Sequence, residues 1–517
     1  MKRLGLLAAL FCVLLFNGAP ALSAEALAPG WDKQVVDYVT NEMAALHAPG
    51  AAVVIVHEAD IVFAQGFGMA STDGVPVTPQ TPFYIASVSK ALTALAVMRV
   101  VEAGRLGLDE QLGSLIPGLV EEGSETAAIS VRDLLGHTSG WSERDGSLNQ
   151  VDPDLAPDAL ERNARRIVTT ALNHSIGEFE YSNANYDLLG YLIEEASGES
   201  YRDYMRSRVF APLEMVNSFA SEEDSLKAGV ATGHYPFFGV VRPHPTLFVP
   251  GSVPSAFLSS SAEDLGHFLI AHLNMGRFRN QTAFSPEGMA ALHRPITYPD
   301  PCCGYAMGLW IVPLQNAGHL VDGSSGISEY QVPVIYEHYG DHSSYASSIL
   351  MLPKERIGVV VLLNVNDQSV SLRYHQMHLG IASILLGEPP PPTTPYEDAI
   401  HRYAKILALG LVGLFLVRTA VSTRRLRRLR KLSPGRSFKT TTVLRYIALP
   451  LVVDTLLLGA SWWFLADQSD APLTLVRRSV PDIFLAMVAA TVVGLGWGLL
   501  RSLIALRALA RSEPRQT

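Results

Sequence analysis

A serine and a lysine three residues apart, Ser87 and Lys90, stand where a turn-rich stretch gives way to an apolar helical pattern. No glycine or proline interrupts this pattern before Gly104, which predicts that Ser87 lies near a helix N-terminus and Lys90 one turn later. Residues three apart share a helix face, so the lysine amine can approach the serine hydroxyl. An ordinary lysine has a pKa of about 10.4 and accepts a proton near neutrality only where its environment favours the neutral amine.

Serine and lysine are common residues, so this spacing is weak evidence when taken alone. Lys90 is, however, the only lysine in the chain with a serine three residues before it. A catalytic interpretation therefore depends on partners elsewhere in the chain.

The chain divides into four parts by composition. A basic start, an apolar core and small residues predict a signal peptide over residues 1–24, with an uncleaved N-terminal anchor as the alternative. Residues 25–388 form the candidate catalytic domain, and residues 389–402 form a linker that is stiff because it is rich in proline. Residues 403–517 form the predicted membrane region.

Three apolar segments of this region predict three transmembrane helices, at Ile406–Val417, Tyr446–Ala466 and Ile483–Leu500. The basic run at 424–431 marks the cytoplasmic side, so the preceding domain is expected outside the bacterial inner membrane, in the periplasm or on the extracellular side. Membrane topology accounts for these arginines, and no nucleic-acid partner is expected. Asp454, inside the second segment, is either an interhelical hydrogen-bonding group or a functional intramembrane acid.

Strand-like runs occur at both ends of the candidate catalytic domain. Residues 51–56 and 61–68 predict a hairpin, and the runs around 332–352 and 359–365 predict further strands with antiparallel pairing. Helical patterns flank these runs, and the middle of the domain is mostly helical. The expected fold class is α+β, with an antiparallel sheet built from both ends of the domain and flanked by helices.

Two further features leave several interpretations open. His137 follows a short predicted helix and either orders its own loop or acts as a catalytic base. The adjacent Cys302 and Cys303 have three interpretations: two free buried thiols, a disulfide between neighbours, or metal ligands. The geometry of disulfides disfavours a bond between neighbouring residues. No Cys/His zinc pattern occurs in the sequence, and we expect neither a metal nor a cofactor.

Two motifs follow the Ser87/Lys90 pair, Tyr181-Ser-Asn183 before a predicted helix and His338-Tyr-Gly340 in a predicted strand. In this order the three motifs resemble those of the penicillin-recognising serine hydrolases, which include class C β-lactamases, D-Ala carboxypeptidases and related esterases and peptidases. The resemblance covers about residues 32–388 and implies a β-lactamase/transpeptidase-like fold.

The resemblance implies a nucleophile and its proton-transfer partners. Ser87 attacks a carbonyl carbon and becomes acylated, and water later releases the acyl group. Lys90 and Tyr181 share the proton transfers, and the sequence leaves open which of the two is the base in each step.

The same resemblance implies the groups that hold the substrate. Asn183 contacts the substrate amide or the lysine, while His338 and Gly340 line the site from a strand edge. The backbone N–H groups of Ser87 and Asp341 form the oxyanion hole, which stabilises the negative charge of the tetrahedral intermediate.

The leader, the domain and the apolar tail together resemble the membrane-anchored, colibactin-maturation type of peptidase, which removes an N-acyl-D-amino-acid cap from nonribosomal prodrugs. This chain differs from that branch at the third position of the tyrosine motif, which is Asn183 here and a serine in the Tyr-x-Ser motif of the branch. It also differs in the run Asp341–Ser344 that follows Gly340.

The expected function is therefore that of a membrane-anchored periplasmic serine peptidase or amidase. The alternatives are an esterase, β-lactamase or D-Ala carboxypeptidase of the same fold, and a membrane sensor that is acylated without turnover. The expected partners are a small acylated peptide or amide and the lipid bilayer, with self-association through the tail helices.

Overall fold

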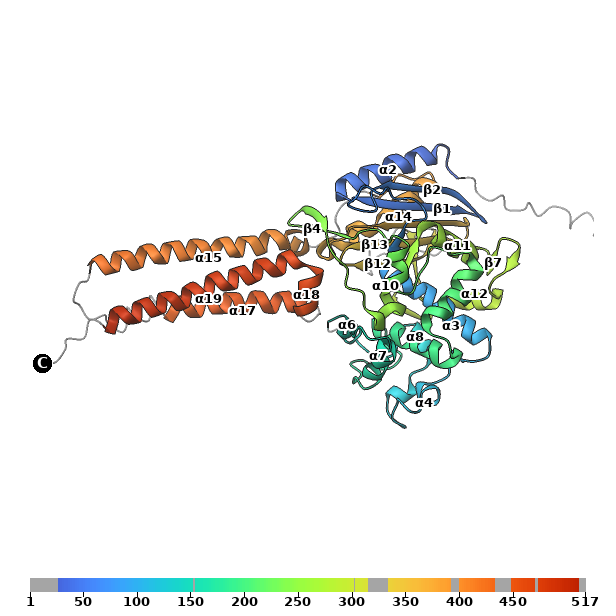
Figure 1. The fold of residues 1–517 in the computed structure, drawn as a ribbon, viewed down its shortest axis with the longest axis horizontal. Coiled ribbons are helices and arrows are strands. Elements are labelled where there is room, and N and C mark those ends of the chain that lie inside the picture. The colour runs from blue at the N-terminus through green and yellow to red at the C-terminus, as the bar shows by residue number, and fades with distance from the viewer. Residues whose placement is uncertain are drawn as a thin grey trace, which may run out of the picture.

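The computed structural model describes residues 27–151, 154–301, 303–314, 333–391, 399–432, 448–469 and 473–510. The predicted signal peptide, Cys302 and half of the proline-rich linker (392–398) lie outside these described residues. The structure has two parts, an α+β body and a helical bundle that extends from one side of the body (Figure 1).

The body contains an eight-stranded antiparallel sheet in the order β2-β1-β14-β13-β12-β11-β10-β9. Its strands are β1 (Gly50–His57), β2 (Asp60–Gly68), β9 (Thr297–Asp300), β10 (Cys303–Tyr305), β11 (Trp310–Pro313), β12 (Val334–His342), β13 (Tyr345–Leu352) and β14 (Ile357–Leu363). Because β1 pairs with β14, the first and last parts of the body lie side by side. This confirms the predicted sheet, whereas the short strands β9, β10 and β11 were not predicted.

Helices cover both faces of the sheet, so the central strands β13 and β14 are buried along their whole length. On one face, α11 (Ala262–Leu273) packs against β1 and β14. A Cβ atom on Gly266 of this helix would lie 2.8 Å from Val54, so glycine permits the close approach. On the other face, α2 (Trp31–Leu46) packs against α14 (Met377–Leu385).

The middle of the chain forms the helical part of the body, as predicted, and lies below the sheet in Figure 1. Its central helix is α3 (Ser89–Glu102), which is buried on nearly all sides and contacts α8 (Asn183–Ser197). The other helices of the body are α4 (Leu112–Leu115), α5 (Val131–Leu135), α6 (Glu143–Val151), α7 (Ala159–Val168), α9 (Tyr201–Tyr204), α10 (Glu222–Lys227), α12 (Pro286–Leu292) and α13 (Ser371–His375).

Three two-stranded sheets complete the body. They pair β3 (Pro82–Tyr84) with β6 (Ser259–Ser261), β4 (His234–Phe237) with β5 (Val240–Pro243), and β7 (Arg277–Phe278) with β8 (Gln281–Thr282). The β4–β5 hairpin lies in a stretch rich in proline, glycine and aromatic residues, and it contacts the bundle.

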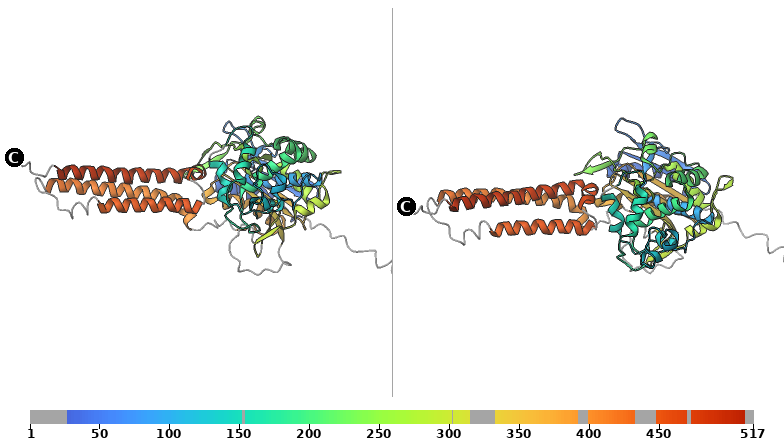
Figure 2. Two further views of the ribbon diagram at one scale, coloured as in Figure 1. Left: turned by 90° about the horizontal axis from the view of Figure 1, so that it is seen from below. Right: turned by 60° about the horizontal axis from the view of Figure 1, so that its bottom comes forward.

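The tail forms the bundle, whose long helices run side by side away from the body in all views (Figure 2), while one short helix lies at the end nearest the body (Figure 1). They are α15 (Ala399–Leu432), α17 (Leu449–Ser469), α18 (Leu473–Ser479) and α19 (Pro481–Ala510).

Among the described residues, two helical segments are long and apolar enough to cross a membrane, Tyr403–Arg425 and Pro481–Ile504. The prediction of three such helices is therefore wrong. Within the described residues the apolar part of α17 is Leu449–Leu465, and polar residues follow it in the same helix at 467–469; residues 433–447, which precede the helix, lie outside the described residues. This described apolar part is shorter than the stretch of about 20 residues that a transmembrane helix needs.

Candidate active site

Ser87 lies in a short 3-10 turn, η1 (Ala86–Val88), that leads directly into α3. Ala86 has a φ of 44°, in the left-handed region that residues other than glycine adopt at a cost in conformational energy. Ala86 and Val88 are buried, whereas Ser87 is partly exposed at the start of the helix. The sharp turn thus presents one accessible hydroxyl on a rigid, buried support.

Lys90 lies one turn further along α3 and is fully buried. Its Nζ atom lies 3.1 Å from Ser87 Oγ, 2.7 Å from Asn183 Oδ1 and 3.0 Å from the Ser255 carbonyl oxygen. A neutral amine has two N–H donors and one lone pair, which matches two oxygen acceptors and a donating serine hydroxyl. The geometry therefore suits an amine that accepts the serine proton.

Burial also lowers the pKa of Lys90 to about 7, although the negative charges of Asp187 and Glu143 act in the opposite direction. A large fraction of the amine is then neutral near pH 7, unlike that of an exposed lysine. The structure thus supplies the condition under which a lysine can act as a general base.

This pKa predicts a specific pH dependence. We expect the rate of covalent labelling at the serine to rise through about pH 7 and then level off, because deprotonated Lys90 is the reactive form. The measurement is the second-order labelling rate constant of a fluorophosphonate, taken from about pH 5 to pH 9. A rate that begins to rise only near the ordinary lysine pKa would contradict the assignment.

Tyr181 lies immediately before α8, beside the buried amine. Lys90 Nζ is 4.8 Å from the centre of the Tyr181 ring. Burial raises the pKa of Tyr181 well above its usual value, while a hydrogen bond with Ser87 acts in the opposite direction. The phenol therefore keeps its proton near neutral pH and can donate it.

His137 supports the loop that carries Tyr181. Its ring lies 4.3 Å from the Tyr181 ring between centres, and its Nδ1 atom accepts a hydrogen bond of 3.1 Å from the Ser182 N–H. Burial lowers the pKa of His137 well below its usual value, so the ring is neutral. His137 thus holds the tyrosine loop as well as its own loop.

Strand β12 forms the opposite wall. A Cβ atom on Gly340 would lie 2.2 Å from the Ile85 carbonyl oxygen and 3.0 Å from Ala86 Cβ, so only glycine lets the strand pack against the serine turn. His338 is buried on the same strand, with Nδ1 2.7 Å from the Tyr339 carbonyl oxygen. Burial lowers the pKa of His338 to about 3, so this wall contributes no positive charge from the imidazole.

The structure brings the predicted residues together from three elements. Ser87, Lys90 and Asn183 form one hydrogen-bonded group, Tyr181 lies over the amine, and the Gly340 backbone packs against the serine turn. The rings of Tyr181 and His338 are 6.3 Å apart between centres.

Sequence reasoning missed two contributors to the environment of the amine. Ser255 supplies a carbonyl oxygen from a segment that carries no motif. Asp187 is buried, accepts hydrogen bonds of 2.9 Å from Asn163 and Ser252, and favours the charged form of Lys90. Asp187 stands four residues after Asn183 on α8, so helical spacing was a signal that could have revealed it.

Cys303 is buried in β10 and is disulfide-bonded, so the interpretation of two free thiols is wrong for this residue. Within the described ranges, no group of three or more His, Cys, Asp or Glu side chains is arranged to hold a metal ion.

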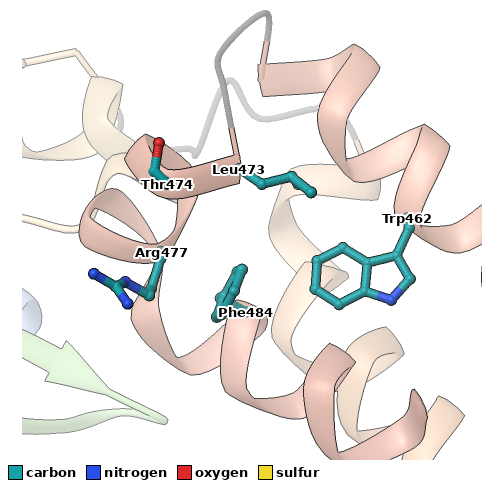
Figure 3. Close-up of a pocket in the computed structure, with 5 residues that line it drawn as sticks. All are labelled: Trp462, Leu473, Thr474, Arg477 and Phe484. Carbon is teal, nitrogen blue, oxygen red and sulfur yellow. The ribbon is translucent and has the colours of Figure 1, made fainter. Parts of the chain in front are cut away.

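A separate cavity of about 210 Å³ lies in the bundle, lined by Trp462, Leu473, Thr474, Arg477 and Phe484 (Figure 3). The rings of Trp462 and Phe484 are 5.5 Å apart between centres, in an edge-to-face arrangement. None of the predicted nucleophile or proton-transfer residues contributes to its lining, so it is not the reaction site.

A partly exposed serine at a helix start, bonded to a buried lysine of lowered pKa and flanked by a tyrosine, defines a serine hydrolase site. The comparison with known families agrees with this class. The chain belongs to the Beta-lactamase family, whose model matches residues 35–381.

Curated relatives cover much of the chain. It is similar to Protein flp of Staphylococcus aureus (strain MRSA252), with 27% identity over 456 residues that cover 83% of this chain and 84% of that protein. It is also similar to Penicillin-binding protein 4 of Amycolatopsis lactamdurans, with 30% identity over 259 residues, covering 48% of this chain and 65% of that protein.

Solved structures resemble the body in fold. The octameric penicillin-binding protein homologue from Pyrococcus abyssi aligns with a TM-score of 0.57 and 26% identity, covering 73% of this chain and 81% of that one. D-alanine carboxypeptidase AmpC from Burkholderia cenocepacia aligns with a TM-score of 0.55 and 22% identity, covering 69% of this chain and 98% of that one. The second likeness concerns the fold alone, and it confirms the predicted β-lactamase-like α+β architecture.

Proposed function

We propose that this serine hydrolase is a membrane-anchored peptidase or amidase that works through an acyl-serine intermediate at Ser87. The observation that carries the proposal is the 3.1 Å contact between Ser87 Oγ and Nζ of Lys90, a fully buried lysine with a lowered pKa. An accessible serine paired with a neutral amine needs no distant base to become a nucleophile.

In the proposed acylation step, Ser87 Oγ attacks the substrate carbonyl while its proton passes to the neutral amine of Lys90. The backbone N–H groups of Ser87 and Asp341 hold the resulting oxyanion. Tyr181 then donates its phenolic proton to the leaving amine, and the proton on Lys90 replaces it. Asn183, already bonded to the lysine, orients the substrate amide, and water later releases the acyl group.

The bundle supports anchoring in a membrane. Its two long apolar helices leave large apolar side chains exposed, including Leu416 and Val492, which is unfavourable in water and favourable in lipid. Arg424 and Arg425 lie towards the end of α15 that is remote from the body (Figure 1). By the positive-inside rule, that end is cytoplasmic and the body lies outside the bacterial inner membrane, in the periplasm.

For the substrate, we propose a small acylated peptide or amide, with an N-acyl-D-amino-acid cap on a nonribosomal prodrug as the narrower candidate. The amide class is supported by the similarity to Penicillin-binding protein 4, because penicillin is itself a cyclic amide. The narrower candidate rests on the combination of leader, domain and apolar tail.

The experiment that tests this proposal uses the purified full-length protein. It is incubated with labelled penicillin, simple esters and N-acyl-D-amino-acid amides, and adducts and products are identified by mass spectrometry. We expect an adduct on the peptide that contains Ser87 and release of free amine from the amides. Turnover of esters or penicillin alone would replace the amidase assignment, and a stable adduct without turnover would favour a sensor.

A further inference from the structure

The body and the bundle are joined by a polar contact between Lys405 of α15, which is partly exposed, and two buried carboxylates. Its Nζ atom lies 2.6 Å from Asp367 Oδ2 in the body and 2.9 Å from Asp482 Oδ2 at the start of α19. It also donates a hydrogen bond of 3.0 Å to the Pro236 carbonyl oxygen on β4. One amine thus connects both long apolar helices to the body.

Asp482 adds a second set of contacts to the β4–β5 hairpin. Its carboxylate is completely buried and accepts hydrogen bonds of 2.7 Å from the Tyr235 hydroxyl and 2.9 Å from the Phe238 N–H. Because the Asp367 and Asp482 carboxylates are buried, removing a partner from either of them costs more than breaking an exposed ion pair. The junction is therefore a defined contact of fixed geometry.

The junction leads to the active-site strand through two adjacent residues. Asp367 contacts Lys405, while its neighbour Asn366 points into the body. The Asn366 side-chain amide donates to the His342 carbonyl oxygen at 2.7 Å and to the Asp341 carboxylate. Asn366 thus holds the end of β12 that follows Gly340.

We propose that Lys405 and Asp482 are positioning residues that fix, through Asp367 and Asn366, the strand end that carries the Asp341 N–H. The inference rests on the proposed function, in which that N–H stabilises the oxyanion. A donor displaced from its place loses much of its effect on the transition state, even when the substrate still binds. The apolar helices accordingly act on the chemistry in addition to anchoring the body.

The test compares full-length variants in detergent. We expect Lys405→Met to lower the maximal rate constant for acylation by penicillin about tenfold. The concentration that gives half of that rate, and the pH midpoint near 7 set by Lys90, are expected to stay unchanged. Lys405→Arg, which keeps a donor for both carboxylates, is expected to restore most of the rate.

A second comparison traces the path. If the effect passes through Asn366, the double variant Lys405→Met/Asn366→Ala acylates no more slowly than Asn366→Ala alone. Asp454→Asn is the matched control, because it removes the carboxylate charge that pairs with Arg418 and Arg501 within the same bundle and leaves the junction intact; it should keep the wild-type rate.

Three outcomes would overturn the proposal. A wild-type rate in Lys405→Met, or effects of Lys405→Met and Asn366→Ala that multiply independently, would refute the path while leaving the serine hydrolase assignment untouched. A wild-type protein that is not acylated at Ser87 at all would refute the proposed function together with the inference that rests on it.

Discussion

The Ser87→Ala variant is expected to form no covalent adduct with penicillin or fluorophosphonate and to lose turnover by about 10⁴-fold or more. The reason is that Ser87 Oγ is the only atom that the proposal uses as a nucleophile, and alanine removes that atom while fitting the same turn. Mass spectrometry of the labelled protein measures the first effect, and product release over hours measures the second.

The fold of this variant is expected to survive, because Ser87 is partly exposed and its oxygen contacts only site residues. The matched control is Ser114→Ala, which removes an exposed serine hydroxyl on α4 that bonds only to the local backbone. We expect wild-type labelling in that control. An adduct that persists in Ser87→Ala would assign the nucleophile to another residue.

The central sheet could be predicted because its strands carry a strong local signal. The apolar runs of β1 and β14 are each long enough to identify, and the short turns between later strands imply antiparallel pairing. The short strands β9, β10 and β11 have only three or four residues each, so no alternation of side chains can develop. Their pairing depends on the neighbouring strand β12, which a local pattern cannot show.

The β4–β5 hairpin was missed for a different reason. Its sequence is rich in proline, glycine and aromatic residues, which predicts irregular backbone. Part of what holds it comes from the tail, where Asp482 and Lys405 bond to its turn and its strand. Those residues are more than 160 positions away in the sequence, so only the folded chain reveals the contact.

The site was predictable where one element supplies the spacing. Ser87 and Lys90 lie one turn apart on one helical segment, and the structure places their polar atoms 3.1 Å apart. The low pKa of the amine was not predictable, because it depends on burial by distant segments and on a carbonyl oxygen of Ser255. Tertiary structure thus decides whether the motif can be reactive.

The tail shows the limit of composition as evidence. Three apolar segments are visible in the sequence, but among the described residues only the helices α15 and α19 contain a stretch of full length. The helix α17 returns the chain beside α19, and its described apolar part, Leu449–Leu465, is shorter than either of those stretches. Composition identifies a segment as apolar. The length of the apolar stretch within one helix decides whether that helix can cross a membrane.

Replacement of Lys90 by methionine is expected to lower the acylation rate by about 10³-fold, within the range for loss of a general base. Methionine has a similar length and no charge, so it fills the buried space without accepting the serine proton. The variant is also expected to lose the rise in rate near pH 7, because the group that titrates there is gone. The measurement is the labelling rate constant as a function of pH.

The loss of the amine also has a structural cost that the experiment must separate from the chemical one. The Asn183 and Ser255 oxygens lose their donor, which is expected to lower the free energy of unfolding by about 1–3 kcal/mol for each buried acceptor. Thermal unfolding therefore accompanies the kinetics, with Lys227→Met, at an exposed lysine paired with Glu223, as the control. A folded Lys90→Met protein that keeps the wild-type rate and the inflection near pH 7 would show that another group is the base.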